Sequence, residues 1–580
     1  MALVRAGDRR FALVADHDER ALHTVDASSM HEIAVTALPG RPGHVLALAD
    51  GRIAVSLRDT ARVLILEATD DTLSQPFEER CSTTVAVEPW ALAEAGDRLL
   101  VASGFGAALT MLGKADLQPL RTIPLAREPR AVLVTNGGTT AFVTHAVGGL
   151  VSAIDLTDAG KPVDLIKLHA GRRVGKDTSD DKGPREASQG YALAGVIGPR
   201  ASDERDTLRL YAPHTSVDPG APEGGATSGY GGATVLPIAP IVSVIDPVAK
   251  RSITNHVASA FDSPVAANCL LPRGAVADEK SLFVACLDLD AVLDLDPWIG
   301  DPAVAERRRF ALPAGPSALA LSDDGQRLFV WSELDRALSR IDRNIDSAKA
   351  PAGAVTSTVL WRRAGESRDP RLERGRRLFH STRDARISQG RACASCHPEG
   401  RDDGLLWTSP DGARQTPMLA GRLANTAPFG WFGEAPTVRE HLKKTFTRLG
   451  GTGFDNPAAA RDLEALIAYA TSLPPPPVSP PSDLEATARG RKVFSAYCND
   501  CHKEGGTDGL THDVGTGVAG ERQSAFDTPS LRGVRGSAPY FHDGRHATLA
   551  DLLAQKNQRM FVGTLSESEQ HDLLRYLETL

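Results

Sequence analysis

A two-strand unit recurs along the first 360 residues, and it constrains the fold more than any other feature of the chain. Each unit has a short apolar stretch, a polar turn, and a second apolar stretch that often ends near Asp. Most units begin 40–47 residues apart, which is the period of a four-stranded propeller blade. The seven units lie at residues 11–26, 52–67, 98–112, 140–156, 208–218 with 240–251, 281–296 and 327–342.

This spacing predicts a seven-bladed β-propeller over residues 1–362, with a β-sandwich plus other β structure as the alternative. The stretch SALALSDDGQRLFVWS (317–332) resembles the YVTN-type propeller repeat. Residues of about 170–240 are polar and Gly-rich, so we interpret them as an inserted surface loop. We expect AVTSTVLWR (354–362) to complete the last blade beside the first strand of the chain.

The rest of the chain has helical patterning and is internally duplicated. The copies span residues 366–473 and 482–580, and a stiff Pro-rich linker (474–481) joins them. Each copy opens with Arg-Gly-x-x-x-Phe and closes with an amphipathic helix that carries a tyrosine (Gly375, Phe379 and Tyr469; Gly490, Phe494 and Tyr576). We therefore predict two small all-α domains of about 100 residues each.

Each copy also carries a CxxCH motif: Cys393, Cys396 and His397 in the first, and Cys498, Cys501 and His502 in the second. A structural zinc needs four clustered ligands, and a thioredoxin-like CxxC needs an α/β context. Covalent haem explains every residue, because two thiols take the vinyl groups and the next imidazole binds the iron. The motifs predict two covalently bound c-type haems, with His397 and His502 as proximal ligands.

Covalent haem is normally attached outside the cytoplasm, so we expect a periplasmic or otherwise exported protein. The first 20 residues lack a basic region followed by an apolar one, so a signal peptide is not present in this chain. Cys269 and Cys286 are either a disulfide or small buried apolar residues. No run of 18 apolar residues predicts a membrane span, and a net charge of −8 argues against nucleic acid as a partner.

The helical half resembles the di-haem cytochrome c peroxidase/MauG family. The resemblance covers about 210 residues and rests on the paired motifs, on TPSLRGVRGSAPYFHDGRHATLADLL (528–553), and on TPMLAGR with GWFGEAPTV in the first copy. It implies that Trp431 carries electrons between the haems, and that His542 and Asp543 lie near the second haem.

The resemblance also implies distal ligands and a calcium ion. Met560 follows His502 by 58 residues, the spacing of the methionine ligand in small class I cytochromes c, and Lys556 is its competitor. Met418 follows His397 by 21 residues, too few for that loop, so the first haem has His441 or an open site. The family's calcium lies by carbonyls that match Ser537 and Pro539, but Gln415 replaces its asparagine ligand.

One departure bears on catalysis. The peroxidases carry a His-Pro-x-Glu-Met stretch whose glutamate helps to break the O–O bond, and KKTFTRLGGTGFDNPAAARDLEAL (443–466) has no such stretch. Glu434, beside Trp431, is the carboxylate that we nominate instead.

Three functions are open. The first is a di-haem oxidoreductase that reduces hydrogen peroxide or oxidises a partner protein or small molecule, with the propeller as a docking platform. The second is a non-catalytic electron-transfer module with both irons six-coordinate, in which the propeller selects the redox partner. The third makes the propeller the catalytic half, as in quinoprotein dehydrogenases, and it lacks a visible cofactor site.

Overall fold

The chain divides into two compact units in a computed structural model. The model describes residues 1–135, 137–174, 181–199, 206–220, 230, 238–255, 268–343, 355–360, 369–554 and 565–580. One unit comprises Met1–Gly171, Glu186–Val217 and Ile238–Ser367, and the other comprises Arg172–Arg185, Asp218–Pro237 and Arg368–Leu580. Each unit is described separately below.

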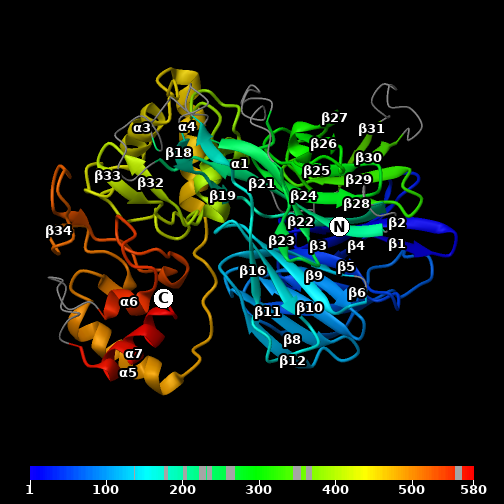
Figure 1. The fold of residues 1–580 in the computed structure, drawn as a ribbon, viewed down its shortest axis with the longest axis horizontal. Coiled ribbons are helices and arrows are strands. Elements are labelled where there is room, and N and C mark those ends of the chain that lie inside the picture. The colour runs from blue at the N-terminus through cyan, green and yellow to red at the C-terminus, as the bar shows by residue number, and fades with distance from the viewer. Residues whose placement is uncertain are drawn as a thin grey trace. The chain divides into compact units, whose positions relative to one another are not determined.

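The first unit is the predicted seven-bladed β-propeller (Figure 1). Its first three blades are β1 (Ala2–Ala6), β2 (Arg9–Asp16), β3 (Ala21–Asp26) and β4 (Glu32–Ala37); β5 (Pro42–Ala47), β6 (Ile53–Leu57), β7 (Arg62–Glu67) and β8 (Glu78–Thr84); and β9 (Pro89–Ala95), β10 (Arg98–Ser103), β11 (Ala108–Gly113) and β12 (Pro119–Pro124).

The fourth and fifth blades are β13 (Pro129–Val134), β14 (Thr140–His145), β15 (Leu150–Asp155) and β16 (Asp164–Lys167); and β20 (Ala194–Pro199), β21 (Asp206–Val217), β22 (Ile238–Asp246) and β23 (Arg251–Ser252), with β19 (Glu186–Ser188) also paired to β21. The last two are β24 (Pro272–Ala277), β25 (Leu282–Cys286), β26 (Ala291–Leu295) and β27 (Glu306–Ala311); and β28 (Pro316–Leu321), β29 (Arg327–Ser332), β30 (Ala337–Asp342) and β31 (Val355–Val359).

The seven units seen in the sequence are the two middle strands of each blade. These strands are buried on both faces, so they read as continuous apolar runs; all five residues of β6 are buried. The outermost strands, such as β8, are largely exposed and polar. The stretch of about 170–240 that we interpreted as a loop contributes β19, β20 and β21 to the fifth blade.

Among the described strands, no blade combines strands from both ends of the chain, so the ring closes through side chains. Every pair of neighbouring blades shares an apolar cluster. Between the last blade and the first, Val14 and Val25 pack with Phe329, and Arg336 donates to the carboxylate of Asp16 over 2.6 Å. The final strand β31 completes the last blade beside β30, so our expectation that it lies beside the chain's first strand is wrong.

Cys269 and Cys286 form a disulfide in the sixth blade. The disulfide is therefore the correct one of the two alternatives, and these cysteines are not simply small buried apolar residues. The bond ties the segment before β24 to the end of β25.

The second unit is mainly helical. Its helices are α1 (Pro370–His380), α2 (Cys393–Cys396), α3 (Val438–Arg448), α4 (Pro457–Ser472), α5 (Leu484–Tyr497), α6 (Leu549–Leu553) and α7 (Glu567–Leu577). Short strand pairs are β17 (Arg172–Val174) with β18 (Asp181–Pro184), β32 (Leu406–Ser409) with β33 (Gly412–Gln415), and β34 (Thr511–His512) with β35 (Phe526–Asp527). Among the described residues, no helix is both long and apolar enough to cross a bilayer.

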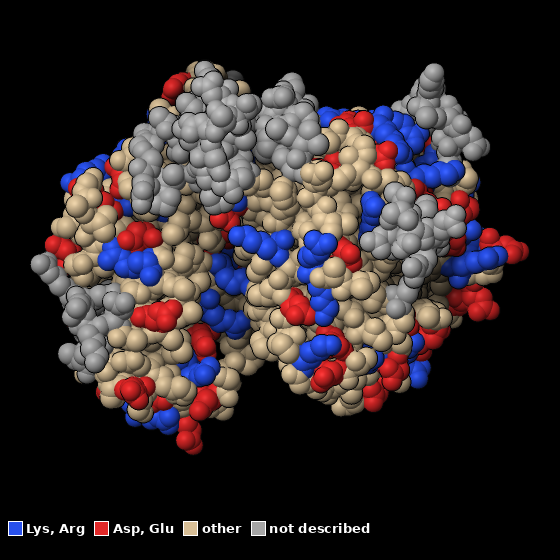
Figure 2. Space-filling view, in the orientation of Figure 1, with Lys and Arg blue, Asp and Glu red and all other residues tan. Residues whose placement is uncertain are grey.

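Acidic and basic side chains are interspersed on the face that Figure 2 shows, rather than gathered in one broad basic patch. This distribution agrees with the net charge of −8.

Candidate functional site

The two helical copies share one packing device, the crossing of their first and last helices. A Cβ on Gly375 of α1 would lie 2.7 Å from the carbonyl carbon of Ala465 in α4, and a Cβ on Gly490 of α5 would lie 2.5 Å from that of Asp572 in α7. Only glycine permits such close approach of two backbones. The repeated Arg-Gly-x-x-x-Phe pattern is therefore explained by helix crossing.

Aromatic rings and ion pairs flank each crossing in the same way. Phe379 contacts Tyr469 with ring centroids 5.4 Å apart, and Phe494 contacts Tyr576 at 5.1 Å. The arginine before each glycine pairs with an aspartate of the closing helix, Arg374 with Asp462 and Arg489 with Asp572. The internal duplication predicted from the sequence thus extends to these contacts.

The first CxxCH motif forms the short helix α2 and the residue after it. Cys393 and Cys396 are not in a disulfide, and burial raises the pKa of Cys393 to about 12. Nδ1 of His397 lies 3.2 Å from the carbonyl oxygen of Arg401. A hydrogen bond from Nδ1–H to this carbonyl leaves Nε2 available as a ligand. Burial lowers the pKa of His397 to about 4, so its imidazole is neutral at pH 7.

The second motif follows the end of α5. Cys498 and Cys501 are also outside any disulfide, and burial raises the pKa of Cys498 to about 12. Nδ1 of His502 lies 3.0 Å from the carbonyl oxygen of Pro529. A backbone carbonyl therefore orients both histidines, and in each of them Nε2 remains available as a ligand.

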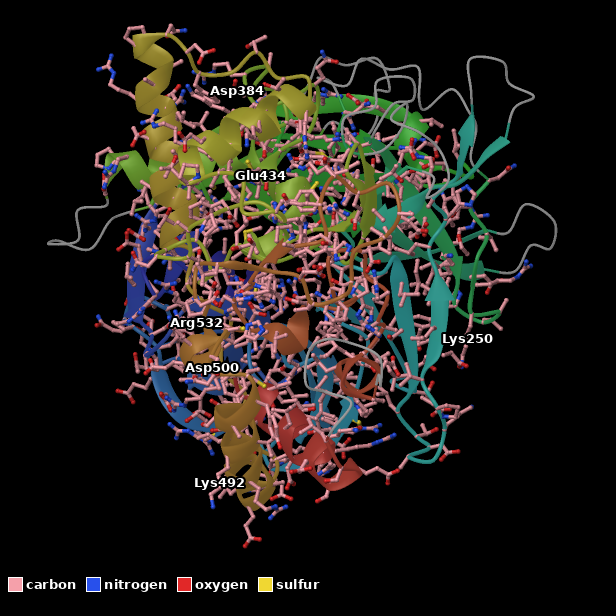
Figure 3. The ribbon with its side chains drawn as sticks, turned by 90° about the vertical axis from the view of Figure 1, so that its left-hand side faces the viewer. Lys250, Asp384, Glu434, Lys492, Asp500 and Arg532 are labelled. Atoms are coloured by element: carbon pink, nitrogen blue, oxygen red, sulfur yellow. A yellow bond between two sulfur atoms is a disulfide. The ribbon has the colours of Figure 1, made fainter. Side chains whose placement is uncertain are left out.

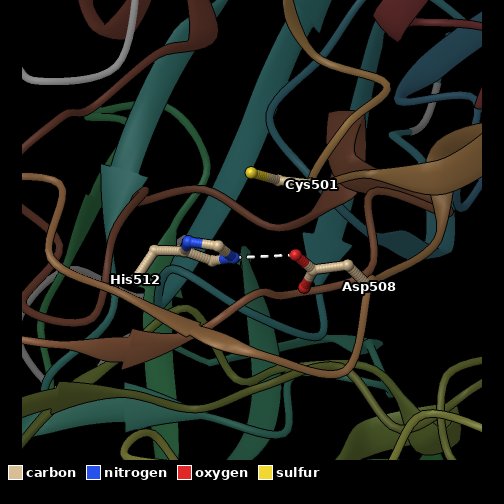
Figure 4. Close-up of side chains that lie close together, drawn as sticks. All are labelled: Cys501, Asp508 and His512. Carbon is tan, nitrogen blue, oxygen red and sulfur yellow. Dashed lines mark hydrogen bonds and ion pairs between the residues drawn. The ribbon is translucent and has the colours of Figure 1, made fainter.

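Each motif is followed by a carboxylate with an aromatic partner, a feature that the sequence analysis missed. In the first copy, Trp407 Nε1 donates to Asp403 over 3.0 Å; in the second, His512 Nε2 lies 2.7 Å from Asp508 (Figure 4). The aspartate comes six residues after the motif histidine and its partner ten residues after, in both copies. Alignment of the two copies beyond CxxCH would have found these pairs.

The two carboxylates differ in pKa. Burial raises the pKa of Asp403 to about 7, and the indole N–H of Trp407 only partly offsets this. Burial also acts to raise the pKa of Asp508, but the hydrogen bond with His512 brings it below its usual value. The first copy therefore holds a carboxyl group that titrates near neutral pH, and the second holds a carboxylate.

Cys501, Asp508 and His512 also have ligand atoms within 4.8 Å of one another. The equivalent residues of the first copy are Cys396, Asp403 and Trp407, and an indole is no metal ligand. The duplication therefore explains this cluster as the surroundings of a CxxCH cysteine rather than as a separate metal site.

Trp431 and His542 meet where the two copies contact each other. They occupy equivalent positions, each two residues into a hairpin closed by an isolated bridge, Phe429 to Ala435 or Tyr540 to His546. Their ring centroids are 6.4 Å apart.

The imidazole of His542 has further neighbours at this contact. It stacks on Phe526 at 3.9 Å, and its Nε2 lies 3.2 Å from Glu521. Glu521, which the sequence analysis missed, also pairs with Arg414 of the first copy over 2.7 Å. Asp543 pairs instead with Arg545, over 2.6 Å.

Glu434 is held in an ion pair. Its carboxylate lies 3.1 Å from Arg522 of the second copy and accepts from the backbone N–H of Phe432 over 3.2 Å. Figure 3 labels it in the first copy, away from Asp500 of the second CxxCH motif. Both contacts engage the carboxylate that we nominated for peroxide cleavage.

The candidate distal haem ligands differ in how well the structure supports them. Nδ1 of His441, on α3, is buried and has no hydrogen-bond partner among the described residues. His441 lies close enough to His397 to contribute to the lowering of its pKa. The sulfur of Met418 instead faces Gly533 of the second copy. Met560 and Lys556 lie outside the described residues.

The residues expected around calcium do not fit a cation. Nε2 of Gln415 donates to the carbonyl oxygen of Ser537 over 2.7 Å, so that oxygen accepts a hydrogen bond. The guanidinium of Arg422 lies 3.3 Å from the Ser537 hydroxyl and donates to the carbonyl of Arg532. A dication beside this guanidinium would be repelled.

The described residues do fit a haem at each motif. The paired thiols are in no disulfide, and each motif histidine has Nδ1 held by a carbonyl. Nδ1 of the buried His441 has no hydrogen-bond partner among the described residues. These features define the class of the molecule: a seven-bladed β-propeller joined to a duplicated helical part with two CxxCH motifs.

Comparisons with known proteins confirm the resemblance to the di-haem cytochrome c peroxidase/MauG family. The chain is 29% identical over 255 residues to hydrazine synthase subunit gamma of Kuenenia stuttgartiensis, covering 33% of this chain and 72% of the relative. It is 28% identical over 272 residues to the methylamine utilization protein MauG of Methylorubrum extorquens, covering 36% and 76%. No protein-family profile matches the chain.

Among solved structures, hydrazine synthase of K. stuttgartiensis is 16% identical and covers 59% of this chain and 94% of its own, with a TM-score of 0.42. A likeness of this size adds nothing to the assignment of the fold.

Proposed function

We propose that the chain is an exported c-type cytochrome that holds two covalent haems, passes electrons between them, and acts as a MauG-like oxidoreductase. Two class I cytochrome c-like domains (366–473 and 482–580) would each hold one haem. The observation that carries the proposal is the repeated arrangement of free thiols and a carbonyl-held histidine in two equivalent helical frames.

Named residues would hold each haem. Cys393 and Cys396 would form the thioethers of the first haem and His397 its proximal ligand, and the equivalent residues of the second copy would serve the second haem. A bound haem supplies one-electron transfer at iron, and binding of a small oxidant where an axial position is open. The carbonyl at each Nδ1 orients the imidazole and makes it a more basic ligand.

Trp431 is proposed as the bridge between the two sites. Its ring contacts His542 across the contact between the copies, and its Nε1 donates to the carbonyl of Gln415 over 3.2 Å, which fixes the indole. Trp431 is half-buried, and His542 is buried and stacks on Phe526. Met560 remains the proposed distal ligand of the second haem, and the first haem has either His441 or an open site.

Two features support export and partner recognition. A disulfide between Cys269 and Cys286 is typical of oxidising compartments, where CxxCH motifs are also loaded. The propeller, whose described residues bring together no cluster of catalytic residues, is proposed as the platform that docks a redox partner.

A non-catalytic electron-transfer module is the second candidate, and the ion pair of Glu434 with Arg522 favours it. This carboxylate is the one nominated for peroxide cleavage, and Arg522 engages it, so it is not free to meet a small oxidant. His441 as a sixth ligand would also close the first site.

One titration separates the two candidates. The exported holoprotein is titrated with cyanide and with hydrogen peroxide while the Soret band is recorded. A high-spin ferric signal and a shift on either addition support the oxidoreductase. Two low-spin haems that respond to neither ligand support the electron-transfer module.

A further inference from the structure

The contact between the two helical copies has an approximate two-fold pattern in its backbone hydrogen bonds. The N–H of Gln415 donates to the carbonyl of His542 over 2.8 Å, and the N–H of Asp527 donates to the carbonyl of Trp431 over 3.0 Å. Gln415 and Asp527 occupy equivalent positions, each directly before Thr-Pro, as do Trp431 and His542. The backbone of each copy therefore holds the aromatic residue of the other copy.

The side chains on the two sides of this contact differ. Nε2 of Gln415 donates to the carbonyl oxygen of Ser537 over 2.7 Å, and the carbonyl of Gln415 accepts from Nε1 of Trp431 over 3.2 Å. Oδ1 of Asp527 is buried and accepts no hydrogen bond among the described residues. Gln415 therefore connects Trp431 of its own copy to Ser537 of the other copy.

Arg422 brings a positive charge to the Gln415 side of the contact. Its Nε donates over 2.6 Å to the carbonyl oxygen of Arg532, a residue labelled in Figure 3, and its Nη2 donates to the Ser537 hydroxyl over 3.3 Å. Both acceptors are uncharged oxygen atoms of the second copy. Ser537 therefore accepts from Gln415 at its carbonyl and from Arg422 at its hydroxyl.

The equivalent position of the second copy shows that the helical frame does not need this charge. Gly421 and Gly533 both have positive φ, 71° and 68°, so the same turn precedes Arg422 and its equivalent, Val534. Val534 is buried in an apolar cluster that includes Phe494. Because the same turn carries an apolar side chain in one copy and a guanidinium in the other, the guanidinium is explained by the contact between the copies.

The oxygen atoms at this contact are of the kind that a calcium ion binds. Calcium is held by oxygen ligands, among them backbone carbonyls. Here N–H groups of Arg422 and Gln415 occupy the oxygens of Arg532 and Ser537 instead. A guanidinium is charged at neutral pH and, unlike a bound ion, cannot be removed by a chelator.

We infer that Arg422 is the built-in cation of the contact between the two copies, and that with Gln415 it positions Trp431 without a metal ion. Arg422 acts through Ser537, because it holds this residue where Gln415 binds its carbonyl, and Gln415 in turn holds the Trp431 indole. The inference deepens the proposed function and rests on it, since Trp431 is a bridge only when both copies hold haem.

The first test is hydrogen exchange in the exported holoprotein, read by mass spectrometry of short peptides. Arg422→Ala and Arg422→Gln remove the charge, Arg422→Lys keeps it, and Arg491→Ala, at an exposed position of α5, is the matched control. Exchange at the amides of Gln415 and Asp527 is expected to rise about ten-fold in Arg422→Ala and Arg422→Gln, equal to about 1.4 kcal/mol. Arg422→Lys should stay within about three-fold of the wild type.

Two outcomes of this test would overturn the inference. Wild-type exchange at both amides in Arg422→Ala would show that the contact does not depend on this side chain. Wild-type exchange in Arg422→Gln would show that a neutral amide suffices, so that the charge has no role. The amides within α5 and α7 are the internal control and should be unchanged in every variant.

The second test asks whether calcium can take the place of the guanidinium. Arg422→Ala/Gln415→Asn removes the guanidinium and shortens the amide side chain, so the carbonyls of Arg532 and Ser537 lose these donors. Calcium chloride, added at matched ionic strength, is expected to slow exchange at the Asp527 amide about ten-fold in this variant and to leave the wild type unchanged. No response in the double variant, or a response in the wild type, would overturn the assignment of Arg422 as the built-in cation.

Both tests report on the contact whether or not the haems are bound. An exported wild-type protein without haem would refute the proposed function, while exchange at these amides would still decide whether Arg422 holds the two copies together.

Discussion

Replacement of Gly490 by alanine tests the helix crossing that frames the second site. In an isolated helix this change stabilises by about 1 kcal/mol, because glycine is the poorer helix former. Here the added Cβ would lie 2.5 Å from the carbonyl carbon of Asp572 and closer still to its oxygen. This Cβ would clash with the backbone of α7, so α5 must move away from α7 by roughly 1 Å.

That movement loosens a well-packed cluster. Phe494, Leu573 and Leu577 are all nearly inaccessible to solvent at this crossing. A gap of about 1 Å forfeits up to about half of each dispersion contact across it. Overpacking against a backbone costs about 3 kcal/mol or more, which outweighs the propensity gain, so we expect a net loss of about 2–4 kcal/mol.

Hydrogen exchange read by mass spectrometry measures this loss segment by segment. Gly490→Ala should deprotect α5 and α7 and leave α1 and α4 unchanged, and Gly375→Ala should do the reverse. Lys492→Ala, on the exposed side of α5, is the matched control and should change protection by less than about 0.5 kcal/mol. Equal or greater protection of α5 and α7 in Gly490→Ala would refute the crossing.

Three further predictions concern the sites themselves. Asp403 is protonated in the folded protein up to about pH 7, so the stability it provides is complete below its unfolded pKa of about 4 and is lost as pH rises through 7. Asp403→Asn should remove this pH dependence of the free energy of unfolding, which amounts to up to about 4 kcal/mol between pH 4 and 8 and is measured by urea unfolding. If the free energy of unfolding changes with pH equally in the mutant and the wild type, the prediction is wrong. Trp431→Phe should slow electron equilibration between the haems about ten-fold after rapid one-electron reduction, with Trp407→Phe as control; an unchanged rate would exclude the bridge. EDTA followed by added calcium should leave the melting temperature unchanged, because Gln415 donates to the carbonyl expected to bind the ion; a rise on adding calcium would show that the ion binds.

The propeller could be predicted because its middle strands are doubly buried. Apolar runs such as those of β6 and β25 are visible in the sequence without any partner. The outermost strands are rich in polar, exposed residues, as in β27 (ERRRFA), so no periodicity marks them. The fifth blade is the least visible in the sequence, because its strands alternate along the chain with segments that belong to the helical unit.

The cysteines and histidines of the site could be predicted because their function demands adjacency in the sequence. Glu521 meets His542 and Arg414 only through tertiary folding, and the sequence has no local pattern for these contacts. Asp403 and Asp508 lie between these cases, since comparison of the two copies would have identified both.

The most direct test of the central claim is the intact mass of the exported protein, together with its pyridine haemochrome spectrum. We predict the polypeptide mass plus two haems, and plus one haem when Cys393 and Cys396 are both changed to alanine. A colourless protein with the mass of the bare polypeptide, from cells that mature other c-type cytochromes, would contradict it.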